Sequence, residues 1–173
     1  MTNLGILAPT QNERFLAALS HLSILIPRLG FIDLSFIVPF IIWVTQKDKS
    51  QYLAFQSFQA FTYQVCRSAA SLIGYICLVS SVFIFNTSAL LPIGNTYLIT
   101  GFIFTAYGIV GAVMAFQGKT FRYWLIGHRV EQAMPSIMEH KSVIYILFTG
   151  ITIVCVLILL GIYIMAAIGQ ANA

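Results

Sequence analysis

Charged residues are scarce in this chain, which has nine Lys and Arg and five Asp and Glu among its 173 residues. They make up 8% of the sequence, whereas 59% is hydrophobic and the mean hydropathy is +0.90. A soluble domain of this length needs a charged surface, and this chain lacks the residues to make one. We therefore expect lipid to surround most of it. The net charge of +4 forms no basic stripe, so no nucleic-acid partner is predicted.

The sequence also lacks the spacings typical of metal sites and catalytic centres. Its three cysteines form no C-x-x-C pair and lie in apolar segments, which predicts packing positions for Cys66, Cys77 and Cys155. His128 and Glu131 stand three residues apart, but a metal site needs further ligands at similar spacing. Ser20 and His21 are neighbours in sequence, which is not the geometry of a nucleophile and its base. We predict neither an enzyme nor a metal site.

What the sequence does contain is a series of long apolar segments, separated by short loops that hold most of the charge. Because about 20 apolar residues cross a bilayer as a helix, the predicted fold is all-α, a polytopic membrane helical bundle of about four spans. The first span is broken, and an interfacial amphipathic segment precedes the last. The expected parts are a polar leader at 1–14, a family-like membrane domain at 15–130 and an additional C-terminal transmembrane helix at 135–173. Inside the membrane domain we expect a broken helix at 15–44, spans at about 60–85 and 96–117, and the interfacial segment at 118–134.

The first apolar segment, residues 15–44, is too long for one straight span, because it would rise about 45 Å against a hydrocarbon core of ~30 Å. Pro27 and Gly30 interrupt it, which favours two shorter helices. Either the first half lies at the membrane interface, or the two halves form a bent or re-entrant unit. A single crossing would place the N-terminus outside, whereas a re-entrant hairpin would place it inside.

Asp33 lies deep in this apolar segment, about 21 Å along a helix from Lys47. A carboxylate at that depth is costly unless it is paired, protonated or turned toward protein. Arg28 is the nearest partner in sequence, and we expect the two to form a structural pair at the helix break. A carboxylate that handles protons or ions is the alternative interpretation.

Four polar residues follow the loop at 45–50 at helical spacing and therefore share one face of a helix. They are Gln56, Gln59, Tyr63 and Arg67. Counting back from the end of the apolar run puts the glutamines among the lipid headgroups, with Arg67 extending to the interface. In that position the double change Gln56→Leu with Gln59→Leu would be tolerated. The alternative is a polar groove between helices, in which Arg67 pairs with an acid such as Asp33.

The span at about 96–117 carries small residues four positions apart, Gly108 with Ala112 and Gly111 with Ala115. Small residues at this spacing allow helices to approach closely. We therefore expect this face to pack against protein.

The charge distribution predicts the orientation in the membrane. Loops 45–50 and 118–142 hold basic residues, whereas loop 86–95 and the C-terminus hold none. By the positive-inside rule the two basic loops are cytoplasmic, in a multi-pass protein of a bacterial inner membrane. Residues 118–134 alternate basic and aromatic side chains, as is typical of a segment that lies on anionic headgroups.

Three stretches carry a family resemblance: ALSHLSIL at 18–25, PFIIWVTQKDKSQYLAFQSFQAFTYQ at 39–64 and GKTFRYWLIGHRVE at 118–131. In this order they resemble a bacterial integral membrane family of unknown function that is distantly similar to the Tic import component of the chloroplast inner envelope. The resemblance covers residues 15–130. Trp124 stands where a proline is expected, and the last span lies outside the family domain. The resemblance implies no catalytic residues.

These features favour a non-catalytic integral membrane protein, a small scaffold or accessory subunit of a larger membrane complex. The expected partners are the lipid bilayer and other membrane-protein subunits. The resemblance implies one alternative, a Tic-like translocation or insertion component. A further alternative is a pigment- or cofactor-associated subunit of a photosynthetic or electron-transfer complex, in which His21 ligates a chlorin or haem. No cofactor other than lipid is predicted by the residues themselves.

The orientation can be tested by cysteine labelling in intact cells. Lys47, Lys49 and Arg122 are expected in the cytoplasm, and residues 86–95 and Ala173 outside. An impermeant thiol reagent should label Thr87→Cys and spare Ser50→Cys. Labelling of Ser50→Cys with protection of Thr87→Cys would reverse the topology.

Overall fold

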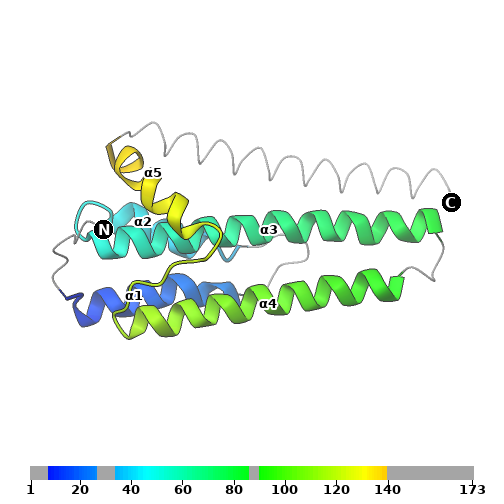
Figure 1. Cartoon of the computed structure of the whole chain (residues 1–173), viewed down its shortest axis with the longest axis horizontal. Coiled ribbons are helices and arrows are strands. Elements are labelled where there is room, and N and C mark those ends of the chain that lie inside the picture. Colours follow the sequence, from blue (N-terminus) through cyan, green and yellow to red (C-terminus); the bar gives the residue numbers. More distant parts are fainter. Residues whose placement is uncertain (1–7, 27–33, 86–89, 140–173) are drawn as a thin grey trace. The chain divides into compact units, whose positions relative to one another are not determined.

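The computed structural model describes residues 8–26, 34–85 and 90–139. This part of the chain is entirely helical and contains no strand, which confirms the all-α prediction for it. Its elements are α1 (Gln11–Leu22), the 3-10 helix η1 (Ser23–Leu25), α2 (Ile37–Gln46), α3 (Gln51–Phe85), α4 (Leu90–Phe116) and α5 (Gly127–Glu139) (Figure 1). Residues 1–132 form one compact unit, and the second unit, 133–173, begins inside α5.

A capping box starts α1. The Thr10 hydroxyl accepts a hydrogen bond from Glu13 N, and the Glu13 carboxylate accepts one from Thr10 N at 2.7 Å. The two side chains thus satisfy backbone donors that the first helical turn cannot pair internally. A hydrogen bond from the Ser50 hydroxyl and a second from Thr10 lower the pKa of the Glu13 carboxyl. The start of α1 is therefore tied to the loop between α2 and α3.

Aromatic side chains hold α2 against α3. Trp43 of α2 is fully buried and packs on Phe58 of α3, with ring centroids 5.1 Å apart. Phe40 and Phe61 form a second pair at 5.3 Å. Such pairs stabilise a helix contact by about 0.5–1.5 kcal/mol beyond the burial of their area. The short α2 is thus fixed along the first half of α3.

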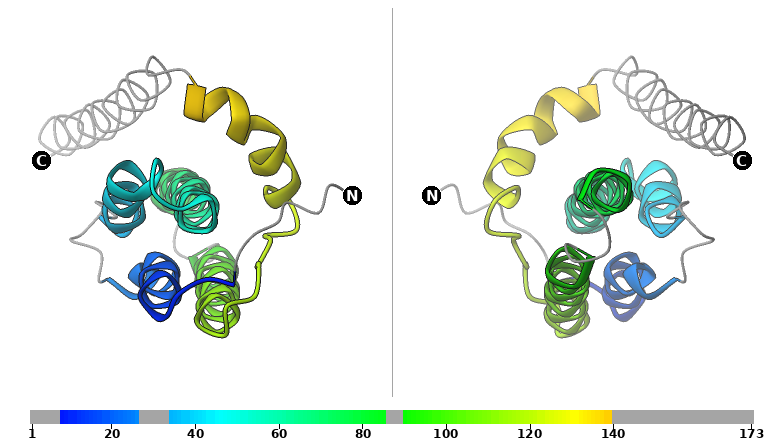
Figure 2. Two further views of the ribbon diagram at one scale, coloured as in Figure 1. Left: turned by 90° about the vertical axis from the view of Figure 1, so that its left-hand side faces the viewer. Right: turned by 90° about the vertical axis from the view of Figure 1, so that its right-hand side faces the viewer.

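The first unit has a thick half and a thin half. Helices α3 and α4 run side by side, whereas α1 and α2 cover only the first half of α3 and the second half of α4 (Figure 1). End-on views show α1, α2, α3 and α4 around a common interior (Figure 2). A four-helix bundle thereby continues into a two-helix hairpin.

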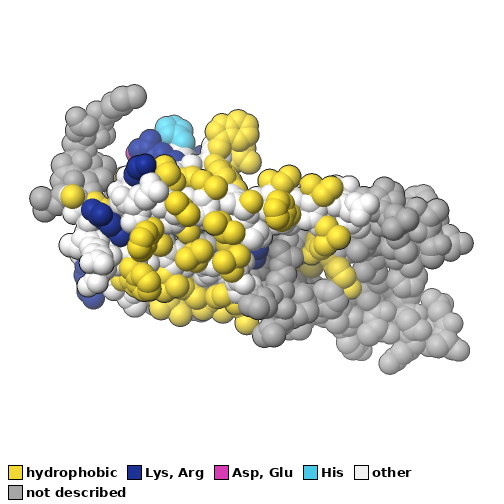
Figure 3. All heavy atoms as spheres, turned by 90° about the horizontal axis from the view of Figure 1, so that it is seen from below, with side chains coloured by type: hydrophobic (Ala, Val, Ile, Leu, Met, Phe, Trp, Pro, Cys, Tyr) yellow, Lys and Arg dark blue, Asp and Glu magenta, His cyan; other side chains and the backbone are white. Residues whose placement is uncertain are grey.

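The bundle has an apolar exterior, and its mainly hydrophobic interior also holds several polar side chains. Large hydrophobic side chains are exposed on three of its helices: Phe15, Leu19, Leu22, Ile37, Ile41, Val44, Val110, Val113 and Phe116. Hydrophobic side chains spread widely over the face shown in Figure 3. The fully buried side chains include His21, Gln56, Gln59 and Gln64. Exposed hydrophobic side chains outside and hydrogen-bonded polar side chains inside fit a bundle in contact with lipid.

One segment of the described helices, Gly94–Phe116, is long and apolar enough to cross a membrane. The other predicted spans, including the C-terminal one, stay predictions. Residues 140–173 and the break at 27–30 lie outside the described part of the chain.

Several predicted boundaries differ from the observed helices. α1 begins at Gln11, inside the expected polar leader, because the capping box starts it there. α4 begins at Leu90, inside the expected loop 86–95, and Pro92 falls in its first turn, where proline is tolerated. Pro135, expected at the start of a new helix, lies inside α5. Cys66, expected to pack, is exposed.

Two glycines of α4, Gly108 and Gly111, lie close to α1, to η1 and to the segment that follows α4. A Cβ on Gly108 would lie 2.8 Å from Cδ1 of Ile24, and one on Gly111 would lie 3.0 Å from both His21 Nδ1 and the Phe121 ring. A Cβ on Gly101, in the thin half, would meet no atom within 4 Å. Along α4, glycine is therefore required for close approach at positions 108 and 111 but not at position 101.

This difference predicts opposite results for matched substitutions. Gly111→Leu should lower the free energy of unfolding by about 1–3 kcal/mol, because the new side chain overpacks the space held by His21 and Phe121. Gly101→Leu should leave stability unchanged. Thermal unfolding of the purified protein in detergent measures both, and equal melting temperatures would contradict the observed packing.

Candidate functional site

The segment between α4 and α5, residues 117–126, turns back onto the bundle through a glycine. Gly118 has a φ of 75°. Its N donates to the carbonyl of Ala115, and Lys119 N donates to the carbonyl of Met114, at 2.9 and 3.0 Å. This is the Schellman pattern that ends helices at a left-handed residue. A Cβ at Gly118 would also lie 2.7 Å from Nε of Arg14. Glycine is therefore favoured here both by the backbone conformation and by the lack of space for a side chain.

His21 of α1 is the centre of a buried hydrogen-bond chain. Its Nε2 lies 3.0 Å from Oε1 of Gln56, and its Nδ1 lies 2.9 Å from the Tyr123 hydroxyl. Because an amide oxygen only accepts, Nε2 must carry the proton, and a neutral Nδ1 then accepts from Tyr123. His21 is fully buried and Tyr123 is 2% exposed. One imidazole thus joins α1, α3 and the 117–126 segment.

The Phe121 carbonyl is the acceptor that fixes this segment to α3. Nε2 of Gln56 donates to it at 3.3 Å, and Nε2 of Gln59 donates at 3.0 Å. An irregular segment in an apolar environment needs such partners for its backbone groups. Oε1 of Gln59 is left without a hydrogen-bond partner beside Gly127, where a Cβ would lie 3.2 Å from it.

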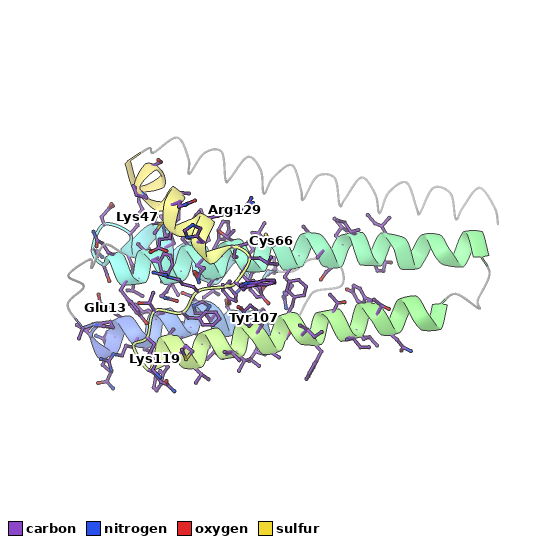
Figure 4. All side chains as sticks on the ribbon, in the orientation of Figure 1. Glu13, Lys47, Cys66, Tyr107, Lys119 and Arg129 are labelled. Carbon is purple, nitrogen blue, oxygen red and sulfur yellow. The ribbon has the colours of Figure 1, made fainter. Side chains whose placement is uncertain are left out.

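Aromatic rings complete the attachment of the segment. The Tyr123 ring stacks on Tyr63 of α3, with centroids 3.8 Å apart and planes within 8°. Tyr63 in turn donates its hydroxyl to the Phe104 carbonyl of α4 at 2.8 Å. Tyr107, labelled in Figure 4, accepts a hydrogen bond from Trp124 N at 3.0 Å. Stacking from α3 and a hydrogen bond from α4 therefore hold the adjacent residues Tyr123 and Trp124.

A second group of polar side chains serves the end of α1 and η1. Nε2 of Gln64 donates to the Ser20 carbonyl and to the Ser23 hydroxyl, each at 3.0 Å. The Arg67 guanidinium donates to the Ile24 carbonyl at 3.3 Å and to the Ser35 hydroxyl at 3.2 Å. Carbonyls at a helix end have no partner within the helix, and a cation there also suits the helix dipole.

The exposure to lipid headgroups predicted for the polar stripe is wrong, because protein covers its side chains. Gln56 and Gln59 are fully buried, Arg67 is 4% exposed and Tyr63 is 7% exposed. All four point into the bundle because α1, α4 and the 117–126 segment cover that face of α3. Periodicity identified the shared face correctly, but it does not say whether lipid or protein covers a face.

The sequence analysis missed part of this cluster. It also predicted a pair of residues that the structure does not describe. Gln64 lies three positions before Arg67 and therefore next to it on one face of α3, a signal that was present in the sequence. The roles of Ser20, Ser23 and Ser35 had no such signal, because their partners are distant in the chain. Arg28 and Asp33 lie outside the described residues.

The cluster carries no arrangement typical of catalysis or metal binding. The Ser20 hydroxyl bonds to the Leu16 carbonyl and the Ser23 hydroxyl to the Ser20 carbonyl, while the nitrogens of His21 bond to Tyr123 and Gln56. Among the described residues no three His, Cys, Asp or Glu side chains form a group that could hold a metal ion. Ligation of a chlorin or haem by His21 would require one of its two hydrogen bonds to break.

Comparison with known protein families matches residues 12–130 to the MamF/MmsF family, described as magnetosome magnetite crystal formation proteins. The match covers more than half of the sequence. The chain belongs to this family. The predicted membership of a bacterial membrane family is thereby confirmed, whereas no comparison supports a similarity to Tic. No curated protein and no solved structure matches the chain.

The buried position of the glutamines reverses the outcome expected from the sequence. In this member of the MamF/MmsF family, Gln56→Leu with Gln59→Leu would remove both donors to the Phe121 carbonyl and the acceptor of His21. Each buried group left unsatisfied costs about 1–3 kcal/mol. The double variant should therefore melt at a clearly lower temperature in detergent.

The matched control is Gln51→Leu, at an exposed position of the same helix. It should melt like the wild-type protein. Wild-type stability of the double variant would show that the glutamines are dispensable and that lipid or water satisfies these groups.

Proposed function

We propose that this MamF/MmsF protein is a non-catalytic accessory protein of the magnetosome membrane, a small multi-pass scaffold that supports magnetite crystal formation. The observation that carries the proposal is the buried polar cluster, whose hydrogen bonds mostly join parts of the chain to one another. Its side chains fix α1, α3 and the 117–126 segment in one arrangement. Such a core suits a protein that presents a constant surface to partners.

The distribution of side chains supports a membrane location. Apolar residues cover the outside of the bundle, and charged residues gather where the helices of the thick half begin or end. Glu13, Lys47 and Lys119 lie together at one end of the thick half in Figure 4, near the start of α1 and the ends of α2 and α4. The positive-inside rule then favours the cytoplasmic side for this end.

The two alternative functions lose support at particular residues. A translocation component would use the polar stripe of α3 to line a path, but the amides of Gln56 and Gln59 already bond to the chain's own carbonyl group. A pigment-binding subunit would use His21, and both of its nitrogens are engaged. The scaffold needs neither group to be free.

Complementation tests the proposed role. The chain would be expressed in a magnetite-forming bacterium from which its own MamF/MmsF member has been deleted. Electron microscopy should show crystal size restored toward the wild type. If the protein is folded in the membrane and crystal size is unchanged, the proposed role in crystal formation is wrong.

The scaffold part of the proposal has a separate measurement. The tagged protein, extracted from these cells in mild detergent, should co-purify with other proteins of the magnetosome membrane. The Gln51→Leu variant should retain them, and the Gln56→Leu, Gln59→Leu variant should lose them as its bundle loosens. Recovery of the wild-type chain without partners would contradict a scaffold.

A further inference from the structure

Two large apolar side chains project from the 117–126 segment. Trp124 is 85% exposed and Leu125 is 76% exposed, more than any other large hydrophobic residue of the described chain. Their neighbours Phe121 and Tyr123 are buried at 8% and 2%. The segment therefore turns Phe121 and Tyr123 inward, whereas Trp124 and Leu125 project outward.

The exposed pair is held on a fixed backbone. Trp124 N donates to the Tyr107 hydroxyl at 3.0 Å, and Gly127 N donates to the Tyr123 carbonyl at 2.7 Å. These bonds anchor the chain directly before and after the two side chains. Trp124 and Leu125 are thus presented outward by the fold and are not the tip of a free loop.

Basic residues flank this pair in the sequence, and their side chains are exposed. Residues 117–132 contain Lys119, Arg122 and Arg129 against one acid, Glu131. Arg122 pairs with Glu131 at 2.9 Å while staying 57% exposed, and Arg129 and Lys119 are exposed as well. Exposed arginines are costly in the hydrocarbon core, so this side of the bundle belongs at the level of the headgroups.

We propose that residues 119–129 bind anionic phospholipid, with Trp124 and Leu125 inserted at the membrane–water boundary and Arg122, Arg129 and Lys119 beside the lipid phosphates. Tryptophan is enriched at this boundary because its ring is apolar while its N–H can still meet a polar group. Lys and Arg near an anionic membrane surface each contribute about 1 kcal/mol of attraction. The match of positive charge to phosphate selects lipid over a neutral protein surface. The inference goes beyond the accessory role and does not depend on magnetite formation.

The two tryptophans of the chain make the test direct. Trp43 is fully buried, and the Trp43→Phe variant leaves Trp124 as the only tryptophan, which can be excited selectively over the tyrosines. The full-length variant is reconstituted into vesicles that contain brominated phosphatidylglycerol or brominated phosphatidylcholine. Brominated phosphatidylglycerol should remove most of the Trp124 emission, and acrylamide added to the water should remove little of it.

Two further variants control the measurement. Trp124→Phe leaves only the buried Trp43, whose emission both quenchers should spare. If Trp43→Phe folds poorly, subtraction of the Trp124→Phe spectrum from the wild-type spectrum isolates Trp124 instead. Brominated phosphatidylglycerol should quench Trp124 more strongly than brominated phosphatidylcholine does. The double change Arg122→Gln with Arg129→Gln should abolish this difference between the two lipids.

Each remaining result overturns a defined part of the proposal. Quenching by acrylamide alone would place Trp124 in water. Quenching by neither reagent would mean that protein covers it, either residues 140–173 or a partner. Equal quenching by both lipids before the arginine changes would remove the preference for anionic phospholipid.

Discussion

The bond from two glutamines to one carbonyl is the interaction on which the rest of this bundle depends. Gln56 and Gln59 of α3 both donate to the Phe121 carbonyl, which belongs to a segment without helical structure. In an apolar environment it is costly to leave such a carbonyl without a hydrogen bond, so the segment packs against the part of α3 that carries the two glutamines. Once it is there, Tyr123 reaches both His21 and Tyr63, and α1 is joined to the same point. Contacts from α1, α3 and the 117–126 segment thus meet at this point of the thick half.

The same requirement explains why a group of polar side chains lies inside the bundle while its exterior is apolar. The end of α1 and η1 offers carbonyls without helical partners, and Gln64 and Arg67 of α3 supply the donors. Lipid cannot satisfy these groups, whereas it readily covers leucine and isoleucine on the outside. Glycines at 108 and 111 let α4 approach closely enough to enclose the cluster. Polar bonds inside and small residues at the contact are the usual means by which helices associate in membranes.

This use of polar groups bears on function. A catalytic or ion-conducting centre keeps polar atoms available to a substrate, whereas His21, Gln56 and Gln64 are bonded to parts of the same chain. The chemistry left for partners lies on the surface, above all in the basic and aromatic residues of the segment that the cluster holds in place. A rigid interior with a defined outer surface agrees with an accessory role in the MamF/MmsF family.

The sequence by itself determined the apolar environment and the helical class, because composition and apolar run length depend on the environment and not on packing. Its three motif stretches indicated the membership of a bacterial membrane family. It also identified the shared face of Gln56, Gln59, Tyr63 and Arg67, whereas the start of α1 at the Thr10–Glu13 capping box fell within the expected polar leader. Only the tertiary structure decided that this face meets protein. Its partners, His21 and the Phe121 carbonyl, lie 35 and 65 residues from Gln56 in the chain. Helical periodicity describes one helix at a time, and it cannot say which distant segment folds against a face.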